Sequence, residues 1–279
     1  MRAADFDRLA EKLYPAVLDA GLLEMQHFKT GVQIETKSDK SPVTIADREA
    51  EAIILAALAE IAPDIPVVAE EAVAAGHIPA PSDEFFLVDA LDGTRLFIRG
   101  KPEFSVNIGL VQHRRPVFGM IYVPPTGDLF FTTADGRAVR ANAPWSLADR
   151  IPFQALTQVT LRAREPDRSN LKAFNSQTAG AAGVGLLKVL NVKTAEPIGS
   201  SLKFCLIAAG EGDLYARLGE TNEWDTAAGQ AILESAGGSV TIDGGTALAY
   251  GKAATIYRNP HFVAWARAPL IADFGRHNR

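Results

Sequence analysis

Carboxylates follow two short apolar segments of the sequence at the point where each segment ends. Glu70 stands two residues after Val67-Val68. Asp89 and Asp92 follow the apolar run Phe85–Val88. Hard cations such as Mg²⁺ take carboxylate oxygens as ligands and keep several waters, so a few acidic side chains suffice. Two such ions about 4 Å apart can hold both oxygens of an in-line phosphoryl displacement. The pattern therefore favours a cation site that acts on a phosphate.

The residues after Asp92 could hold the phosphate itself. Gly93 and Thr94 precede Arg95–Ile98, which we expect to form a short helix, and N–H groups at a helix start bind anions. Glycine lets the backbone approach a phosphate closely. The Thr94 hydroxyl could orient a metal-bound water, and the Leu91 carbonyl could point at a metal. The decapeptide Val88–Phe97 could thus supply metal ligands, a phosphate cradle and a water-positioning group.

Each acidic residue also has a structural interpretation when it is taken alone. Asp47 and Asp225 stand where helix caps occur. Glu70-Glu71 is typical of a solvated loop, and Asp92-Gly93 is a hairpin-turn signal. These interpretations leave unexplained why two neighbouring apolar segments both end in carboxylates, so the cation site is the stronger hypothesis.

The first half of the chain is predicted to form two helices on an antiparallel-rich sheet. Apolar residues recur at helical spacing from about residue 4 to 27. A second helix begins at Thr44, where Thr44-x-x-Asp47 resembles a capping box, and ends at Pro63. Turn residues separate the predicted strands, which are Val67-Val68, Phe85–Val88, Phe104–Val111, Val117–Val123 and Leu129–Thr132.

The second half of the chain alternates between the two kinds of element, which suggests an α/β layer. The predicted strands are Val159–Arg162, Leu186–Leu190, Leu214–Leu218 and Ser239–Ile242. The predicted helices are Leu171–Ala182, Ser200–Ala209 and Asp225–Ser235. Residues 141–158 look like a crossing between subdomains. We therefore expect an N-terminal α+β subdomain over residues 1–145 and a C-terminal α/β subdomain over residues 146–279, so that the fold class is α/β (α+β).

The composition excludes several classes of protein. The net charge of −5 and the lack of a long basic tract argue against a partner that is a nucleic acid polymer. No apolar run approaches the roughly 18 residues of a membrane span. Cys205, the only cysteine, is expected to be a buried structural thiol, and the five histidines lack zinc-ligand spacing. With no signal-peptide pattern, we expect a cytoplasmic protein, and peripheral association with the inner membrane stays open.

Four motifs, in order, resemble signatures of the inositol monophosphatase and fructose-1,6-bisphosphatase superfamily. Val88–Thr94 resembles its D-P-(I/L)-D-G-T motif, and Trp224–Gly229 matches W-D-x-A-A-G. Ala69-Glu70-Glu71 matches its E-E motif, and Ser41–Asp47 matches S-P-V-T-x-A-D. The second half, above all Ile198–Leu206, is similar to the CysQ type of 3'(2'),5'-bisphosphate nucleotidase.

This resemblance implies a layered αβαβα sandwich and a Mg²⁺-dependent phosphatase with two or three ions. The implied reaction removes the 3'-phosphate of 3'-phosphoadenosine 5'-phosphate, a by-product of sulfate assimilation, to give AMP and phosphate. A metal-activated water attacks, no covalent intermediate forms, and Li⁺ inhibits. An inositol phosphate or fructose 1,6-bisphosphate is the alternative substrate. A non-enzymatic phosphometabolite-binding protein is disfavoured because no expected metal ligand is missing. Relatives include monomers and dimers, so a homodimer stays open.

The resemblance also assigns roles to individual residues. The implied metal ligands are Glu70, Asp89, Asp92, Asp225 and the Leu91 carbonyl. The residues that would orient the attacking water are Asp47 and Thr94, with Glu70 assisting. The backbone amides of Gly93 and Thr94 would hold the scissile phosphate. The implied contacts to the nucleotide and its second phosphate are Ser200, Ser201, Lys203 and Arg217. For these last four a structural role is the alternative, since the serines open a predicted helix and Arg217 could lie on the surface.

Three stretches depart from the pattern of the relatives. Ala90 stands where the family usually has proline, which loosens the loop that places Leu91. Arg95-Leu96 replaces the Lys-Glu of CysQ-like sequences. Ala163–Pro166 replaces a Ser-Arg-Ser-His stretch that lies near the nucleotide in relatives, which leaves the nucleotide preference open.

Overall fold

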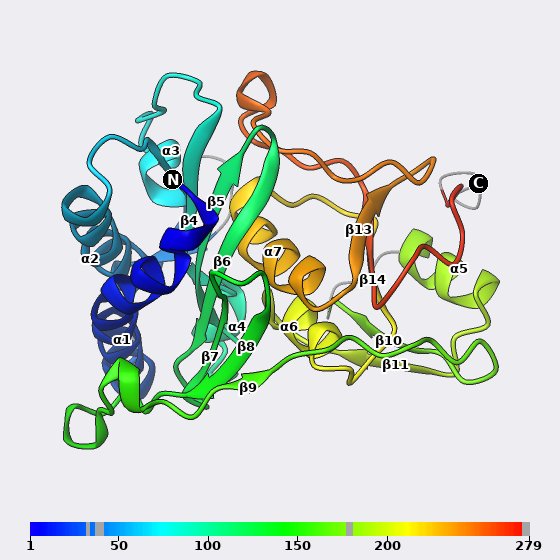
Figure 1. Cartoon of the computed structure of the whole chain (residues 1–279), viewed down its shortest axis with the longest axis horizontal. Coiled ribbons are helices and arrows are strands. Elements are labelled where there is room, and N and C mark those ends of the chain that lie inside the picture. The colour runs from blue at the N-terminus through cyan, green and yellow to red at the C-terminus, as the bar shows by residue number, and fades with distance from the viewer. Residues whose placement is uncertain (32–33, 37–41, 177–180, 275–279) are drawn as a thin grey trace.

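A computed structural model of the chain describes residues 1–31, 34–36, 42–176 and 181–274. Within them, two sheets and three helical layers alternate (Figure 1). Helices α1 (Phe6–Thr30) and α2 (Ile45–Ile61) cover the outer face of a seven-stranded sheet. Helices α6 (Leu202–Ala208) and α7 (Ala227–Ser235) lie between this sheet and a five-stranded one. Helix α5 (Ala181–Val189) packs on the far side of the second sheet. The expected αβαβα sandwich is confirmed.

The first sheet has the strand order β3-β4-β5-β6-β7-β8-β9, in which β3 and β4 are parallel and all other neighbours are antiparallel. Its strands are β3 (Val67–Ala69), β4 (Glu84–Asp92), β5 (Ser105–Gln112), β6 (Arg115–Val123), β7 (Asp128–Thr132), β8 (Ala138–Asn142) and β9 (Val159–Thr160). The second sheet has the order β11-β10-β12-β14-β13. Its strands are β10 (Lys172–Asn175), β11 (Thr194–Pro197), β12 (Leu214–Arg217), β13 (Ser239–Ile242) and β14 (Phe262–Trp265).

The remaining elements are short. A two-stranded sheet joins β1 (Ile34–Thr36) to β2 (Pro42–Thr44), directly before α2. Helix α3 (Glu70–Ala74) follows β3, and α4 (Thr94–Ile98) follows β4. The 3-10 turns are η1 (Ala3–Asp5), η2 (Leu147–Asp149), η3 (Phe153–Ala155), η4 (Glu223–Asp225) and η5 (Ala253–Thr255). Several of the predicted site residues thus stand at ends of elements.

Helix α7 lies unusually close to the first sheet because glycines face it there. A Cβ on Gly119 of β6 would lie 2.2 Å from the Ala228 carbonyl oxygen, and one on Gly109 of β5 would lie 2.7 Å from the Ala227 Cβ. Both distances are too short for real side chains, so only glycine permits this packing. This close approach brings the start of α7 down onto the sheet, and Asp225 comes immediately before it.

Two predicted elements are wrong. Residues 172–175 of the predicted helix Leu171–Ala182 form strand β10, which pairs with both β11 and β12; residues 177–180 lie outside the described residues. The predicted strand Leu186–Leu190 belongs mostly to α5, where Gly183, Leu186 and Leu187 are buried at helical spacing. Neither segment has a clear periodic pattern, so tertiary pairing rather than local propensity decides the element. The two long helices and the five strands predicted for the first half are confirmed.

Candidate metal and phosphate site

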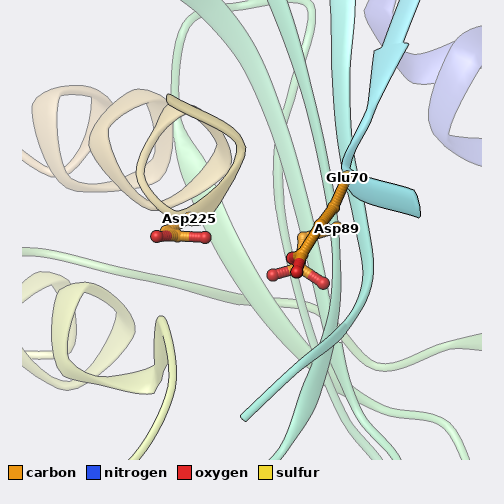
Figure 2. Close-up of side chains that lie close together, drawn as sticks. All are labelled: Glu70, Asp89 and Asp225. Carbon is orange, nitrogen blue, oxygen red and sulfur yellow. The ribbon is translucent and has the colours of Figure 1, made fainter. Parts of the chain in front are cut away.

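Three carboxylates from different parts of the chain meet at the edge of the first sheet. Glu70 opens α3 directly after β3, Asp89 lies on β4, and Asp225 ends η4 directly before α7. Each offers an oxygen within 4.8 Å of the others. Figure 2 shows Glu70 and Asp89 side by side, with Asp225 facing them from the start of the opposite helix. Because β3 and β4 are adjacent and parallel and Ala69 pairs with Val88, the residues that follow these two, Glu70 and Asp89, lie side by side.

The electrostatics of this cluster call for a cation. Burial raises the pKa of Asp89 well above its ordinary value, and the charges of Glu70 and Asp92 raise it further. Burial likewise raises the pKa of Asp225, and again Asp92 and Glu70 add to the effect. Carboxylates this close repel one another unless a cation lies between them. An all-oxygen donor set of this kind suits a hard divalent ion.

Asp92 binds a loop of the second half of the chain. Its Oδ2 accepts hydrogen bonds from Ser201 N at 2.6 Å, from Ser201 Oγ at 2.8 Å and from Ser200 Oγ at 2.8 Å. Asn107 Nδ2 donates to the same oxygen at 3.2 Å. Ser201 Oγ also lies 2.7 Å from the Asp225 carbonyl oxygen. One carboxylate oxygen thus ties together two parts of the chain, while Oδ1 remains for another ligand.

Asp47 acts as a helix cap and also holds Thr94. Its Oδ2 accepts hydrogen bonds from Thr44 N and Thr44 Oγ1, both at 2.7 Å, which caps the start of α2. Its Oδ1 accepts from Thr94 Oγ1 at 2.8 Å. Asp225 combines roles in the same way, since its Oδ2 accepts from Asn222 N at 2.8 Å. The capping and functional interpretations therefore do not exclude each other.

Gly93 has a backbone that only glycine adopts readily. Its φ is +101°, and a Cβ there would lie 2.8 Å from the Glu103 carbonyl oxygen. The chain turns at this point from β4 into α4, and Thr94 Oγ1 lies 3.3 Å from the Leu91 carbonyl oxygen. The turn carries Asp92, Gly93 and Thr94 along one wall of a cavity.

This cavity has a volume of about 640 Å³. Every predicted metal ligand and every predicted substrate contact lines it, while Asp47 stands behind Thr94. The predicted residues that line it are Glu70, Asp89, Leu91, Asp92, Gly93, Thr94, Ser200, Ser201, Lys203, Arg217 and Asp225. The structure thus brings together residues from both halves of the chain.

Lys203, a predicted substrate contact, is buried, and its ammonium group binds the backbone of the loop before α6. Its Nζ donates to the carbonyl oxygens of Ile198 at 3.1 Å and Ser200 at 2.5 Å and lies 4.8 Å from the centre of the Tyr215 ring. Burial lowers the pKa of this ammonium to about 8. Arg217 donates to the Glu220 carbonyl oxygen at 2.6 Å, while its Nε is buried without a partner among the described residues.

Two polar residues of the site were not predicted from the sequence. Asn107 is 1% exposed and donates to both Asp92 and Ser201. Glu103 accepts a hydrogen bond from Gly199 N at 2.6 Å through Oε2. An asparagine in the otherwise apolar segment Val106–Val111 was the available signal, because a buried amide needs hydrogen-bond partners.

The structure shows the surroundings of the three stretches that depart from the family pattern. Ala90 is buried within β4, at the point between Asp89 and Asp92 where the pairing of β4 with β5 shifts register. Leu96 packs against Gly199, where a Cβ would lie 2.2 Å from its Cδ1. Arg164 forms two hydrogen bonds with Asp213, at 2.7 and 2.6 Å. No residue from Ala163 to Pro166 is among those that line the cavity.

Comparison with known proteins agrees with this geometry. Residues 5–274 match the inositol monophosphatase family. The chain belongs to the inositol monophosphatase family. Members of this family are metal-dependent and act on small phosphorylated substrates, which fits the acidic cluster.

Individual relatives are similar over most of the chain. The 3'(2'),5'-bisphosphate nucleotidase CysQ of Shigella flexneri is 39% identical over 209 residues, 75% of this chain and 79% of the relative. That of Salmonella typhimurium is 34% identical and covers 91% of this chain and 98% of the relative. The crystal structure of CysQ from Bacteroides thetaiotaomicron superposes with a TM-score of 0.76 at 33% identity, over 95% of this chain and 99% of that one. None of the described helices combines the length and apolar character needed to cross a bilayer.

Proposed function

We propose that this chain is a Mg²⁺-dependent 3'(2'),5'-bisphosphate nucleotidase. It removes the 3'-phosphate of 3'-phosphoadenosine 5'-phosphate and releases AMP and phosphate. The observation that carries the proposal is the meeting of Glu70, Asp89 and Asp225 in a cavity whose wall includes Thr94, which is hydrogen-bonded to Asp47 behind it. The relatives named as 3'(2'),5'-bisphosphate nucleotidases support the choice of substrate.

The carboxylates would hold the metal. Glu70, Asp89 and Asp225, with Oδ1 of Asp92 and the Leu91 carbonyl, offer enough oxygens for two or three Mg²⁺ ions. When bound, these ions would neutralise phosphate charge and lower the pKa of a water. The protein's own contribution is to hold the ligands on strand and helix ends, so that little reorganisation is needed when substrate binds.

Asp47 and Thr94 would position the attacking water. Thr44 donates hydrogen bonds to Asp47 Oδ2 and so fixes the carboxylate. Its Oδ1 then accepts a hydrogen bond from the Thr94 hydroxyl. The oxygen of Thr94 is then left with lone pairs that can accept a hydrogen bond from water. This arrangement orients a lone pair of that water toward the phosphorus, provided that the phosphate rests on the amides of Gly93 and Thr94.

The experiment that tests this function is a substrate panel. Phosphate release is measured with 3'-phosphoadenosine 5'-phosphate, inositol 1-phosphate and fructose 1,6-bisphosphate, in one buffer, with titrations of Mg²⁺ and Li⁺. We expect the nucleotide to give the highest kcat/KM, activity to require Mg²⁺, and Li⁺ to inhibit. A higher kcat/KM for the inositol or sugar phosphate would contradict the proposed substrate, and tight nucleotide binding without turnover would contradict an enzyme.

A further inference from the structure

Strand β5 places two polar side chains opposite the carboxylates of β4. Asn107 pairs with Asp89 in the register of the two strands. Two residues before it, Ser105 pairs with Asp92, so β4 has one extra residue between the two pairs. Side chains of a regular strand alternate between faces, so this bulge lets both carboxylates face the side that carries the two polar residues. Ser105 and Asn107 are buried and do not line the cavity, so they act only through the side chains that they contact.

The amide of Asn107 uses both of its ends. Its Nδ2 donates to Asp92 Oδ2 at 3.2 Å and to Ser201 Oγ at 2.9 Å. Its Oδ1 accepts a hydrogen bond from Ser105 Oγ at 3.0 Å. A carboxylate only accepts hydrogen bonds, so the amide must turn its nitrogen toward Asp92 and its oxygen toward Ser105. Neither an aspartate nor an apolar side chain at this position could make all three contacts.

This amide also determines where the Ser201 hydroxyl donates. Ser201 Oγ lies 2.8 Å from Asp92 Oδ2 and 2.7 Å from the Asp225 carbonyl oxygen, and it has a single hydrogen. Because Asn107 already donates to Ser201 Oγ, that hydrogen must point to one of these two oxygens. Both oxygens belong to residues that the proposed function assigns to the metal. Asn107 thus acts on Asp92 directly and also through Ser201.

An asparagine at this position is unfavourable if only the fold is considered. Asparagine is depleted in strands, and burying an amide costs free energy that its hydrogen bonds must recover. The neighbouring residues of β5, Val106 and Ile108, are apolar and buried. A buried polar network is also favourable only when its members are all satisfied. The contact with Asp92 therefore explains this amide better than the stability of the strand does.

We propose that Asn107 is a positioning residue of the metal site. It holds Asp92 so that Oδ2 faces Ser200 and Ser201 while Oδ1 faces the cation. This inference rests on the proposed function, because it takes the carboxylate cluster to bind a divalent metal. Hydrogen-bond partners of this kind fix the orientation of a ligating carboxylate, and their loss typically lowers metal affinity by about 10- to 100-fold. Without the amide, the Asp92 carboxylate would be freer to rotate away from the metal.

The test measures metal binding directly, without substrate. Mn²⁺ takes the same carboxylate and carbonyl ligands as Mg²⁺, and its binding is followed by the loss of the free-ion electron paramagnetic resonance signal. Asn107→Leu keeps about the same size of side chain but has no donor, so we expect it to raise the Kd of Mn²⁺ by about 10- to 100-fold. Asn107→Ser, whose hydroxyl ends short of Asp92, should raise the Kd as well and keeps the test open should Asn107→Leu not fold.

Thr132→Val is the matched control for a purely structural loss. Thr132 is a buried polar residue of β7 in the same sheet, where its Oγ1 accepts a hydrogen bond from Gly119 N at 3.2 Å, and it does not line the cavity. This variant should lower the Tm and leave the Kd of Mn²⁺ unchanged.

The outcomes separate this inference from the proposed function. Asn107 variants that bind Mn²⁺ as tightly as the wild type, whatever their Tm, would overturn the positioning role alone. If the wild type binds Mn²⁺ and the variants bind it more weakly, but no bisphosphate nucleotide is cleaved, the positioning role stands and the proposed function fails. A wild type that does not bind Mn²⁺ would overturn both.

Discussion

At the scale of single residues, Thr94 links the predicted water-positioning pair to the phosphate loop. Its hydroxyl donates to Asp47 at 2.8 Å. Thr94→Val keeps the shape and removes the hydroxyl, so we expect kcat to fall by about 10²–10⁴-fold, as for a lost proton-transfer or water-orienting group. Thr94→Ser should keep most of the activity, because it retains the oxygen. Steady-state phosphate release checks this, and a fully active Thr94→Val enzyme would contradict the assigned role.

Glu24 of α1 is an acid buried without a partner. It is 0% exposed, and neither carboxylate oxygen has a hydrogen-bond partner among the described residues. Burial raises its pKa well above the ordinary value, and the charge of Asp47 adds to this. Burial raises the pKa of Tyr122 of β6, and the charge of Glu24 adds to this. The folded state therefore binds this proton more tightly than the unfolded state, and stability should fall as pH rises through the window between the two pKa values.

Glu24→Gln should remove this pH dependence. At pH 8 the variant should be more stable than the wild type by at least about 1.4 kcal/mol, the free energy of one pKa unit, because Gln is neutral without taking up a proton, whereas Glu24 must be protonated or buried as an anion. The difference should shrink as pH falls toward about 4.3, where the unfolded carboxyl is also protonated. Urea unfolding at several pH values measures it, and Glu60→Gln, on the exposed face of α2, is the control. A stability difference that does not change with pH would rule out this account of Glu24.

At the scale of elements, the elements with a clear periodic pattern of apolar residues were predicted from the sequence. Helices α1 and α2 have long apolar stripes, and strands β4 to β7 have apolar runs with turn residues between them. Strand β14 (Phe262–Trp265) was missed and β10 was taken for a helix, because segments of four residues are too short for a periodic pattern that distinguishes the two states. Their partners along the chain lie dozens of residues away and decide the outcome.

The same limit applies to the prediction of the site, because local spacing does not reveal contacts between residues far apart in the chain. Carboxylates at element ends could be recognised from local spacing, and three of them do meet. The hydrogen bonds from Ser200 and Ser201 to Asp92 could not be predicted, because they join residues 108 and 109 positions apart. The sequence therefore indicated which residues gather at the cavity but not that the serines contact a carboxylate.

At the scale of the whole molecule, the cavity is lined from both sheets, by Asp89 of β4 and Tyr215 of β12, and by Lys203 of α6. Gly109 and Gly119 allow α7 to sit against the first sheet, so that Asp225 faces Asp89. Asp92 then accepts hydrogen bonds from the loop before α6. The proposed metal site is thus shared between the two halves of the chain, and its occupancy should affect the stability of the entire fold.

Thermal unfolding with and without Mg²⁺ checks this coupling. An ion that binds only the folded state stabilises it by about 2.7 kcal/mol at 100 times its dissociation constant, so the Tm of the wild type should rise with Mg²⁺. Asp89→Asn removes one of three mutually repelling charges. In chelator the variant should therefore unfold at a higher temperature than the wild type, yet gain little from Mg²⁺. Asp83→Asn, at an exposed position before β4, should behave like the wild type in both conditions. A wild-type Tm that does not change with Mg²⁺ would contradict a carboxylate cluster that binds cations. So would an Asp89→Asn protein that is less stable than the wild type in chelator.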